Sequence, residues 1–231
     1  MFWTFVEPAQ LRGGEIVIEG KKAHHLGRVL RIRVGERGVA VVNGREHVVE
    51  VVQIEGNRVV GKIDEVRPVR NEPLIAVTLL QSLLPNPDFD AVIEGATAVG
   101  ISRLVAIQAT RSITRAGADR HARWQTIAES AAEQSHRGRV PEIAGPMPLP
   151  EALQQSKTVL LVLDPRATTP LSAAAAAITS VTLAVGPEGG WTDEEVRAMD
   201  RAGGTRVSLG PRILRARLAP VVATAILVHQ S

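Results

Sequence analysis

The feature that most constrains the fold is a change of hydrophobic pattern at residues 68–73, a segment with a proline at each end. From residue 14 to about 67, apolar and polar residues alternate, as they do in β-strands with one buried face. After residue 73, short apolar runs alternate with helical patterns, which indicates a parallel sheet covered on both faces. The sequence therefore predicts a small β-barrel domain at 1–70 and an α/β domain at 71–231.

Two turn signals divide the first domain into strands. Asn43-Gly44 and Gly56-Asn57 stand where the alternation breaks, and such pairs are typical of tight β-hairpins. We therefore expect hairpins that join the strands of an antiparallel sheet.

A basic segment at 21–36, KKAHHLGRVLRIRVGE, interrupts this strand pattern. Leu26, Val29 and Leu30 have helical spacing, so we expect a helical turn with these three side chains on one face. Positive side chains surround them, namely Lys21, Lys22, His24, His25, Arg28, Arg31 and Arg33. The turn is a candidate RNA-binding element, and the alternative is a solvated charged face, which runs of charge usually form.

The composition narrows the function classes. The chain has only four lysines, and the rest of its permanent positive charge is arginine, which suits contacts with phosphate. A GC-rich genome would produce the same preference for arginine over lysine.

No cysteine is present, and no spacing typical of zinc ligands occurs, so we predict no metal site. The start of the chain lacks a leader pattern and the apolar run at 218–228 is too short to span a bilayer, so we expect a cytoplasmic protein without a membrane partner.

The α/β domain contains expected strands at 74–83, 102–110, 158–164 and 181–186, and expected helices at 88–100, 123–137 and 171–178. Ligands of an open parallel sheet bind beyond the carboxyl ends of its strands. The loops after 158–164, 181–186 and 206–210 are therefore the candidate site.

The loop at 186–190 reads GPEGG and follows an expected strand directly. Thr192 and Glu195 have the spacing of a capping box, which marks the start of the next helix. Glycines let the backbone approach a ligand closely, so we predict a nucleotide or nucleoside cofactor here. Neither GxGxxG nor a phosphate-binding P-loop is present, which disfavours phosphate as the group bound. The alternative is a purely structural turn.

The GPEGG loop at 186–190 is followed by a second short motif, LGPRILR at 209–215. These two segments and their spacing resemble the RsmE family of SPOUT methyltransferases. HHLGRVLR at 24–31, ATRSI at 109–113 and EQSHRGRVPEI at 133–143 are similar to further family motifs. The resemblance covers nearly the whole chain.

This resemblance implies a PUA-like β-barrel followed by an α/β domain with a trefoil knot. It implies a homodimer that methylates N3 of a uridine in 16S rRNA, with small-subunit rRNA or the assembled 30S subunit as partner. The implied cofactor is S-adenosyl-L-methionine (SAM), held mainly by backbone groups of Leu163, Gly186, Pro187, Glu188, Gly189, Gly190, Leu209, Gly210, Ile213 and Leu214. The implied RNA-binding residues are His25, Arg28 and Arg31.

The reaction has a physical requirement, because N3 of uridine carries a proton that must leave or whose anion must be stabilised. Arg111, Arg137 and Arg215 match family arginines, and a guanidinium can stabilise charge that develops on a uracil oxygen. Glu133 and Glu188 are candidates for a general base. Each could equally be a cap or a carboxylate that braces a loop.

The chain departs from the family pattern at several polar positions. Where the family usually continues Thr-Glu-Thr-Ala, this chain has Ala216-Arg217-Leu218-Ala219. Gly95 stands at an expected lysine and Ala98 at an expected glutamate. An active but divergent enzyme is the interpretation we favour. The alternatives are a catalytically degenerate protein that binds rRNA or assists ribosome assembly, and a nucleotide-dependent enzyme that uses its sheet as a Rossmann fold.

Overall fold

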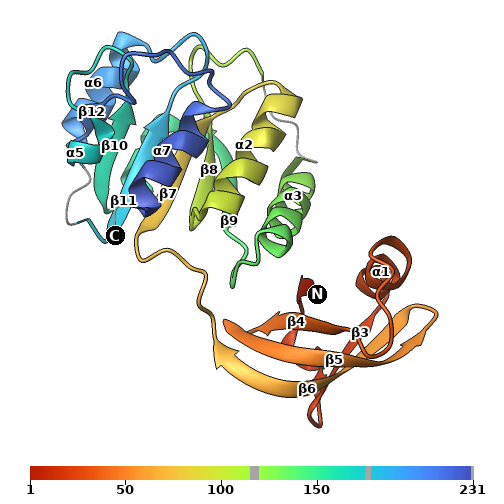
Figure 1. The fold of residues 1–231 in the computed structure, drawn as a ribbon. Coiled ribbons are helices and arrows are strands. Elements are labelled where there is room, and N and C mark those ends of the chain that lie inside the picture. Colours follow the sequence, from red (N-terminus) through yellow and green to blue (C-terminus); the bar gives the residue numbers. More distant parts are fainter. Residues whose placement is uncertain (115–119, 175–177, 230–231) are drawn as a thin grey trace. The chain divides into compact units, whose positions relative to one another are not determined.

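The computed structural model describes residues 1–114, 120–174 and 178–229, which form two compact units (Figure 1). The first unit comprises residues 1–72 and 132–139, and the second comprises 73–131 and 140–231. A β unit followed by an α/β unit confirms the predicted fold class. The structure adds residues 132–139 to the first unit, a contribution that the hydrophobic pattern did not predict.

The first unit is built on one six-stranded sheet, in the order β1-β4-β5-β6-β3-β2. Both predicted hairpins are present, one joining β4 to β5 and one joining β5 to β6. Asn43 and Gly44 have φ values of 49° and 69°, the left-handed conformation that two-residue hairpin turns require. The strands are β1 (Phe2–Phe5), β2 (Leu11–Arg12), β3 (Glu15–Glu19), β4 (Arg37–Val42), β5 (Arg45–Glu55) and β6 (Arg58–Pro68).

Short helical turns precede β2 and connect β3 to β4: the 3-10 turn η1 (Pro8–Gln10), then α1 (Lys21–His24) and the π-helical turn η2 (His25–Val29). The predicted basic helical turn is confirmed, but its predicted apolar face is wrong. Leu26 is buried, whereas Val29 and Leu30 are 59% and 50% exposed. The wider π turn explains the difference, because it rotates later residues away from the face that ordinary helical spacing would give them.

The second unit contains a six-stranded sheet in the order β12-β10-β11-β7-β8-β9. All its neighbouring strands pair in parallel, as the apolar runs predicted. Strand β9 was not expected, because two prolines and a glycine interrupt its sequence. The strands are β7 (Ala76–Ser82), β8 (Arg103–Gln108), β9 (Glu142–Pro148), β10 (Val159–Leu163), β11 (Ser180–Val185) and β12 (Thr205–Val207).

Helices cover both faces of this sheet. Side chains from α2, α3, α5 and α7 join one apolar cluster, and side chains from α4 and α6 join the other. Figure 1 shows α2 and α7 side by side on the first face. The helices are α2 (Asn86–Val99), α3 (Arg120–Gln134), α4 (Leu149–Gln155), α5 (Leu171–Ala174), α6 (Asp193–Arg201) and α7 (Ala219–Val228).

The expected helix at 171–178 is α5 as far as Ala174, and residues 175–177 lie outside the described residues. The expected helix at 88–100 is α2, and its apolar residues Phe89, Val92, Ile93 and Ala96 are buried. In the described part of the chain, no helix combines the length and the apolar character needed to cross a membrane.

The strand order reverses beside β7. The chain moves from β7 through β8 to β9 on one side, and then places β11, β10 and β12 on the other. A reversal of this kind separates the loops that follow neighbouring strands and leaves a crevice beyond their carboxyl ends. The candidate site is therefore expected beyond β10 and β11.

Candidate functional site

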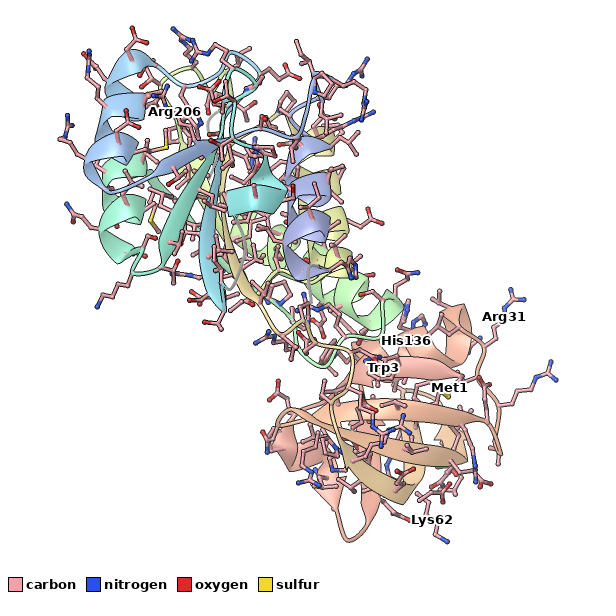
Figure 2. The ribbon with its side chains drawn as sticks, turned by 60° about the vertical axis from the view of Figure 1, so that its left-hand side comes forward. Met1, Trp3, Arg31, Lys62, His136 and Arg206 are labelled. Atoms are coloured by element: carbon pink, nitrogen blue, oxygen red, sulfur yellow. The ribbon has the colours of Figure 1, made fainter. Side chains whose placement is uncertain are left out.

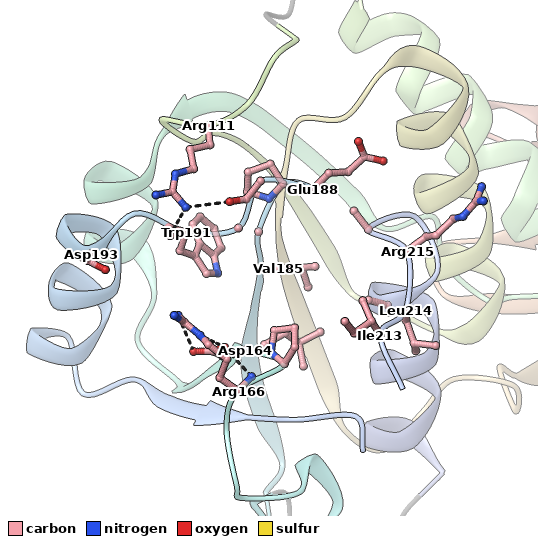
Figure 3. A pocket seen from close by; sticks show the side chains of 18 residues that line it. Arg111, Asp164, Arg166, Val185, Glu188, Trp191, Asp193, Ile213, Leu214 and Arg215 are labelled. Carbon is pink, nitrogen blue, oxygen red and sulfur yellow. Dashed lines mark hydrogen bonds and ion pairs between the residues drawn. The ribbon is translucent and has the colours of Figure 1, made fainter. Parts of the chain in front are cut away.

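A cavity of about 590 Å³ lies beyond the carboxyl ends of β10 and β11 (Figure 3). This volume falls in the range of small-molecule sites. The walls come from the loops that follow β8, β10 and β11 and from the segment that enters α7. A recess of about 50 Å³ adjoins it, and Leu163, Asp164 and Leu214 line both.

The structure brings most of the predicted site residues to these two spaces. The cavity is lined by Arg111, Leu163, Gly186, Pro187, Glu188, Gly189, Gly190, Ile213, Leu214 and Arg215. Leu209 and Gly210 line the adjoining recess. Residues as far apart in the sequence as Arg111 and Arg215 thus meet at one edge of the sheet.

The loop at 186–190 is fixed at its far end by the predicted capping box. The Thr192 hydroxyl accepts a hydrogen bond from the Glu195 backbone N–H at 3.2 Å, and Glu195 Oε2 accepts one from the Thr192 N–H at 2.8 Å. Glu195 Oε1 also accepts a hydrogen bond from the Thr110 N–H at 2.8 Å. One buried carboxylate therefore ties the start of α6 to the loop that follows β8.

Gly186 leaves little room for a side chain because the indole of Trp191 packs directly against it. A Cβ placed on Gly186 would lie 3.1 Å from Trp191 Cε2, a contact so tight that the indole would have to shift by a few tenths of an ångström. Trp191 is 8% exposed and lines the cavity, yet its Nε1 has no hydrogen-bond partner among the described residues. Sequence reasoning missed Trp191, although an aromatic residue directly after the glycines was the available signal.

Arg111 braces this loop from the opposite side. Its Nη1 donates hydrogen bonds to the carbonyl oxygens of Gly189, at 2.9 Å, and Trp191, at 3.2 Å (Figure 3). The side chain predicted to act in catalysis therefore also holds the loop in place.

A second unpredicted residue in the wall is Asp164, which directly follows β10 and is 7% exposed. Burial raises its pKa, but hydrogen bonds from the backbone N–H and the guanidinium of Arg166 outweigh burial and hold the pKa below its usual value. Asp164 is thus a negative charge in the wall shared by the cavity and the recess. An acidic residue immediately after an apolar strand was the signal for it.

Arg137, which was predicted to act in catalysis, is not among the described residues that line the cavity. It belongs to the first unit and is 2% exposed. Its Nη2 donates to Glu72 Oε2 at 2.7 Å, and the Gly138 N–H donates to Glu72 Oε1 at 2.9 Å. Arg137 and Glu72 therefore form an ion pair with a buried guanidinium inside the first unit, and the catalytic role of Arg137 stays a prediction.

Glu133 also belongs to the first unit. One of its carboxylate oxygens accepts hydrogen bonds from the Thr4 hydroxyl at 2.9 Å and from the Phe5 N–H at 3.1 Å. Glu133 therefore has the bracing role that the sequence left open. Glu188, the other candidate base, is exposed and lines the cavity.

The three predicted RNA-binding residues, His25, Arg28 and Arg31, are all exposed on the segment after β3. Arg31 has a φ of 54°, a left-handed conformation that usually favours glycine. Figure 2 shows its side chain directed away from the ribbon. Within the described ranges, no group of acidic, histidine or cysteine side chains could hold a metal ion.

Comparisons with known proteins agree with this picture. Residues 70–228 match the model of an RNA methyltransferase domain, and residues 18–64 match that of an RNA methyltransferase PUA domain. Ribosomal RNA small subunit methyltransferase E of Mycobacterium bovis is 34% identical over 95% of this chain and 88% of its own length. The protein of that name from Synechocystis is 31% identical over 95% of this chain and 75% of its own length.

A solved structure extends the similarity to three dimensions. Ribosomal RNA small subunit methyltransferase E from Neisseria gonorrhoeae, bound to S-adenosyl methionine, is 30% identical and superposes with a TM-score of 0.89. The match covers 97% of this chain and 95% of that one.

Proposed function

The chain belongs to the ribosomal RNA small subunit methyltransferase E family, the RsmE family, and we propose that it transfers a methyl group from SAM to N3 of a uridine in 16S rRNA. The resemblance found in the sequence is therefore confirmed. The observation that carries the proposal for this chain is the cavity beyond β10 and β11, which GPEGG and LGPRILR line together.

The cavity fits SAM in both size and chemistry. Leu163, Val185 and Leu214 offer an apolar surface, and Gly186 allows the backbone to come close to a ligand. Asp164 adds a buried carboxylate to the wall, and Arg166 pairs with its charge. When bound, SAM supplies a methyl group on a positively charged sulfur. The residues proposed to hold it are Leu163, Gly186, Pro187, Glu188, Gly189, Gly190, Leu209, Gly210, Ile213 and Leu214.

Arg215 is the strongest candidate to act on the uracil. It is exposed, lines the cavity, and forms no side-chain hydrogen bond or ion pair with any described residue. Its guanidinium can therefore donate hydrogen bonds to a uracil oxygen as N3 loses its proton. Arg111 can assist while it braces the loop, and Glu188 stays the candidate to accept the proton.

A homodimer and a knot complete the proposal. α7 carries no charged residue, and four of its apolar residues, Val221, Val222, Ala225 and Ile226, are only partly buried. A helix that is apolar on every side is normally covered on every side, which supports a second copy of the chain as its cover.

The proposed trefoil knot lies at the carboxyl end, where the segment after edge strand β12 returns to place α7 against α2 and β7.

We expect Arg31→Gly to separate RNA binding from stability. Glycine removes the strain of the left-handed conformation in the folded state, but it also raises the conformational entropy of the unfolded chain. The free energy of unfolding should therefore stay unchanged or rise by up to about 1 kcal/mol. Affinity for small-subunit rRNA should fall, and the slope of log affinity against log salt should become shallower by about one unit, as for one lost phosphate contact. Filter binding at four salt concentrations measures both.

The control for this prediction is Lys62→Ala, which removes a positive charge from β6, away from Arg31 in Figure 2. It should leave the salt slope unchanged. Equal slopes for Arg31→Gly and the wild type would identify the basic segment as a solvated charged face.

The function itself is tested with labelled SAM and unmethylated small subunits, followed by mass spectrometry of the nucleosides. We expect N3-methyluridine, and an Arg215→Met variant should bind SAM but transfer less methyl. SAM binding without any transfer would instead favour the degenerate assembly factor. Absence of SAM binding would remove the cofactor assignment.

A further inference from the structure

The segment between β12 and α7 forms one wall of the cofactor cavity but has few attachments of its own. Ile213, Leu214, Arg215 and Ala216 line the cavity, and Ile213 is 86% exposed. At one end, the Ser208 N–H donates to the Thr169 carbonyl at 2.9 Å. The position of this wall therefore depends on what holds its other end.

That end is tied to α2 by an ion pair. Arg217 Nη1 lies 3.1 Å from Asp88 Oδ1, and Asp88 stands in the first turn of α2. A negative charge is favoured there by the helix dipole, so Asp88 is a suitable anchor. For residues 209–218, this is the only side-chain hydrogen bond or ion pair within the described part of the chain.

The anchor is rigid because α2 and α7 approach each other closely. A Cβ on Gly95 would lie 2.9 Å from Cγ2 of Val221, a β-branched side chain that has little freedom to move. This contact accounts for glycine at 95, where the resemblance predicts lysine. With α2 fixed against α7, a link from Arg217 to Asp88 fixes the chain just before α7 begins.

We propose that the Asp88–Arg217 ion pair is a positioning device that holds residues 213–216 against the bound cofactor. Arg217 stands where the family usually has a glutamate, and Asp88 supplies the opposite charge that this exchange requires. Arg217 does not touch the cofactor and acts through Leu214, Arg215 and Ala216. The identity of the ligand in this proposal rests on the proposed function. The claim that residues 213–216 are held in one position rests on the ion pair alone.

The test is a charge-reversal cycle. Arg217→Glu and Asp88→Arg each place like charges together, and each should weaken SAM binding about tenfold, which corresponds to about 1.4 kcal/mol. The combined variant restores an ion pair with reversed polarity and should bind within about twofold of the wild type. Arg217→Lys keeps the charge and should also bind within about twofold. Titration calorimetry with SAM measures all five proteins.

Kinetics separate positioning from general damage. With small subunits as substrate, Arg217→Glu should raise KM for SAM about tenfold and change kcat by less than twofold, because the loop is restored once SAM is bound. The matched control is Glu142→Arg. It places like charges together in the Arg103–Glu142 ion pair, which has the same 3.1 Å length and lies at the amino ends of β8 and β9. It should leave KM unchanged.

Hydrogen exchange tests the loop without any ligand. In Arg217→Glu the amides of residues 209–216 should exchange faster, while those of β7 and β11 keep their rates; the combined variant should return to the wild-type pattern. Unchanged exchange, or a combined variant that recovers neither exchange nor affinity, overturns the positioning role. If Arg217→Glu exchanges faster than the wild type but the wild type binds no SAM, the proposed cofactor would be overturned. The role of the ion pair in ordering residues 209–216 would still hold.

Discussion

Gly186→Val is expected to weaken SAM binding about 100-fold while the protein stays folded. The new side chain would force the buried Trp191 indole, already 3.1 Å from the position of a Cβ, into the cavity proposed for the cofactor. Overpacking of this kind costs about 1–3 kcal/mol, and each 1.4 kcal/mol is a factor of ten in affinity. Calorimetric titration with SAM measures the loss, and the melting temperature reports the state of the fold.

Gly189→Ala is the control from the same loop. A Cβ at 189 would lie 3.4 Å from Arg111 Cβ, an ordinary contact, and Gly189 is exposed. Its affinity for SAM should stay within about threefold of the wild type, since no buried group must move. Equal losses in the two variants would mean that the loop needs glycine for its backbone alone, and that Trp191 has no part in shaping the site.

The order of elements could be predicted because hydrophobic period is a local property of the sequence. Period two marked β3 to β6, and apolar runs marked β7, β8, β10 and β11. β1 was not predicted, because its parallel pairing with β4 joins segments more than thirty residues apart. The path of residues 132–139 into the first unit depends on contacts with residues 3, 4, 5 and 72, which no local pattern contains.

The loops that line the cavity could be located because carboxyl ends of parallel strands meet at one edge of the sheet. The roles of single side chains could not. Arg137 and Arg215 both stand in family motifs, and only the fold reveals that one is buried against Glu72 and the other faces the cavity. Asp164 and Trp191 were missed because each acts through a neighbour, namely Arg166 and Gly186.

Arg137→Met is expected to lower the free energy of unfolding of the first unit by about 3–5 kcal/mol at pH 7, the usual cost of breaking a buried ion pair from one side. Methionine keeps much of the side-chain length but removes the charge. Glu72, whose side chain is 18% exposed, would then keep the exposed Arg139 as its charged partner and the Gly138 N–H as a further hydrogen-bond donor. Denaturant unfolding, followed by amide exchange in β5 and separately in β11, assigns the loss to one unit.

Arg139→Met is the matched control, because Arg139 Nε also lies 2.7 Å from Glu72 Oε2 but its side chain is 46% exposed. Exposed pairs contribute about 0–1 kcal/mol, so this variant should lose no more than that. Similar losses in the two variants would mean that burial of Arg137 does not set the strength of its pair.

The loss in Arg137→Met should depend on pH, with a sign that follows from Glu72. Burial raises the pKa of Glu72, but hydrogen bonds and charge from Arg137 and Arg139 outweigh burial and hold the pKa below its usual value. A carboxyl group whose pKa is lower in the folded state stabilises the fold at pH values above its unfolded pKa of about 4.3. This stabilisation is lost as the pH falls through the folded pKa.

In Arg137→Met, burial of Glu72 is opposed by fewer favourable interactions, so the pKa of Glu72 should rise. Protonation of Glu72 should then remove the cost of its buried charge in the variant. The difference in unfolding free energy between the two proteins should therefore be largest near pH 7 and shrink below about pH 4.3. A difference that stays constant from pH 7 to pH 3 would assign the loss to side-chain packing and not to the ion pair.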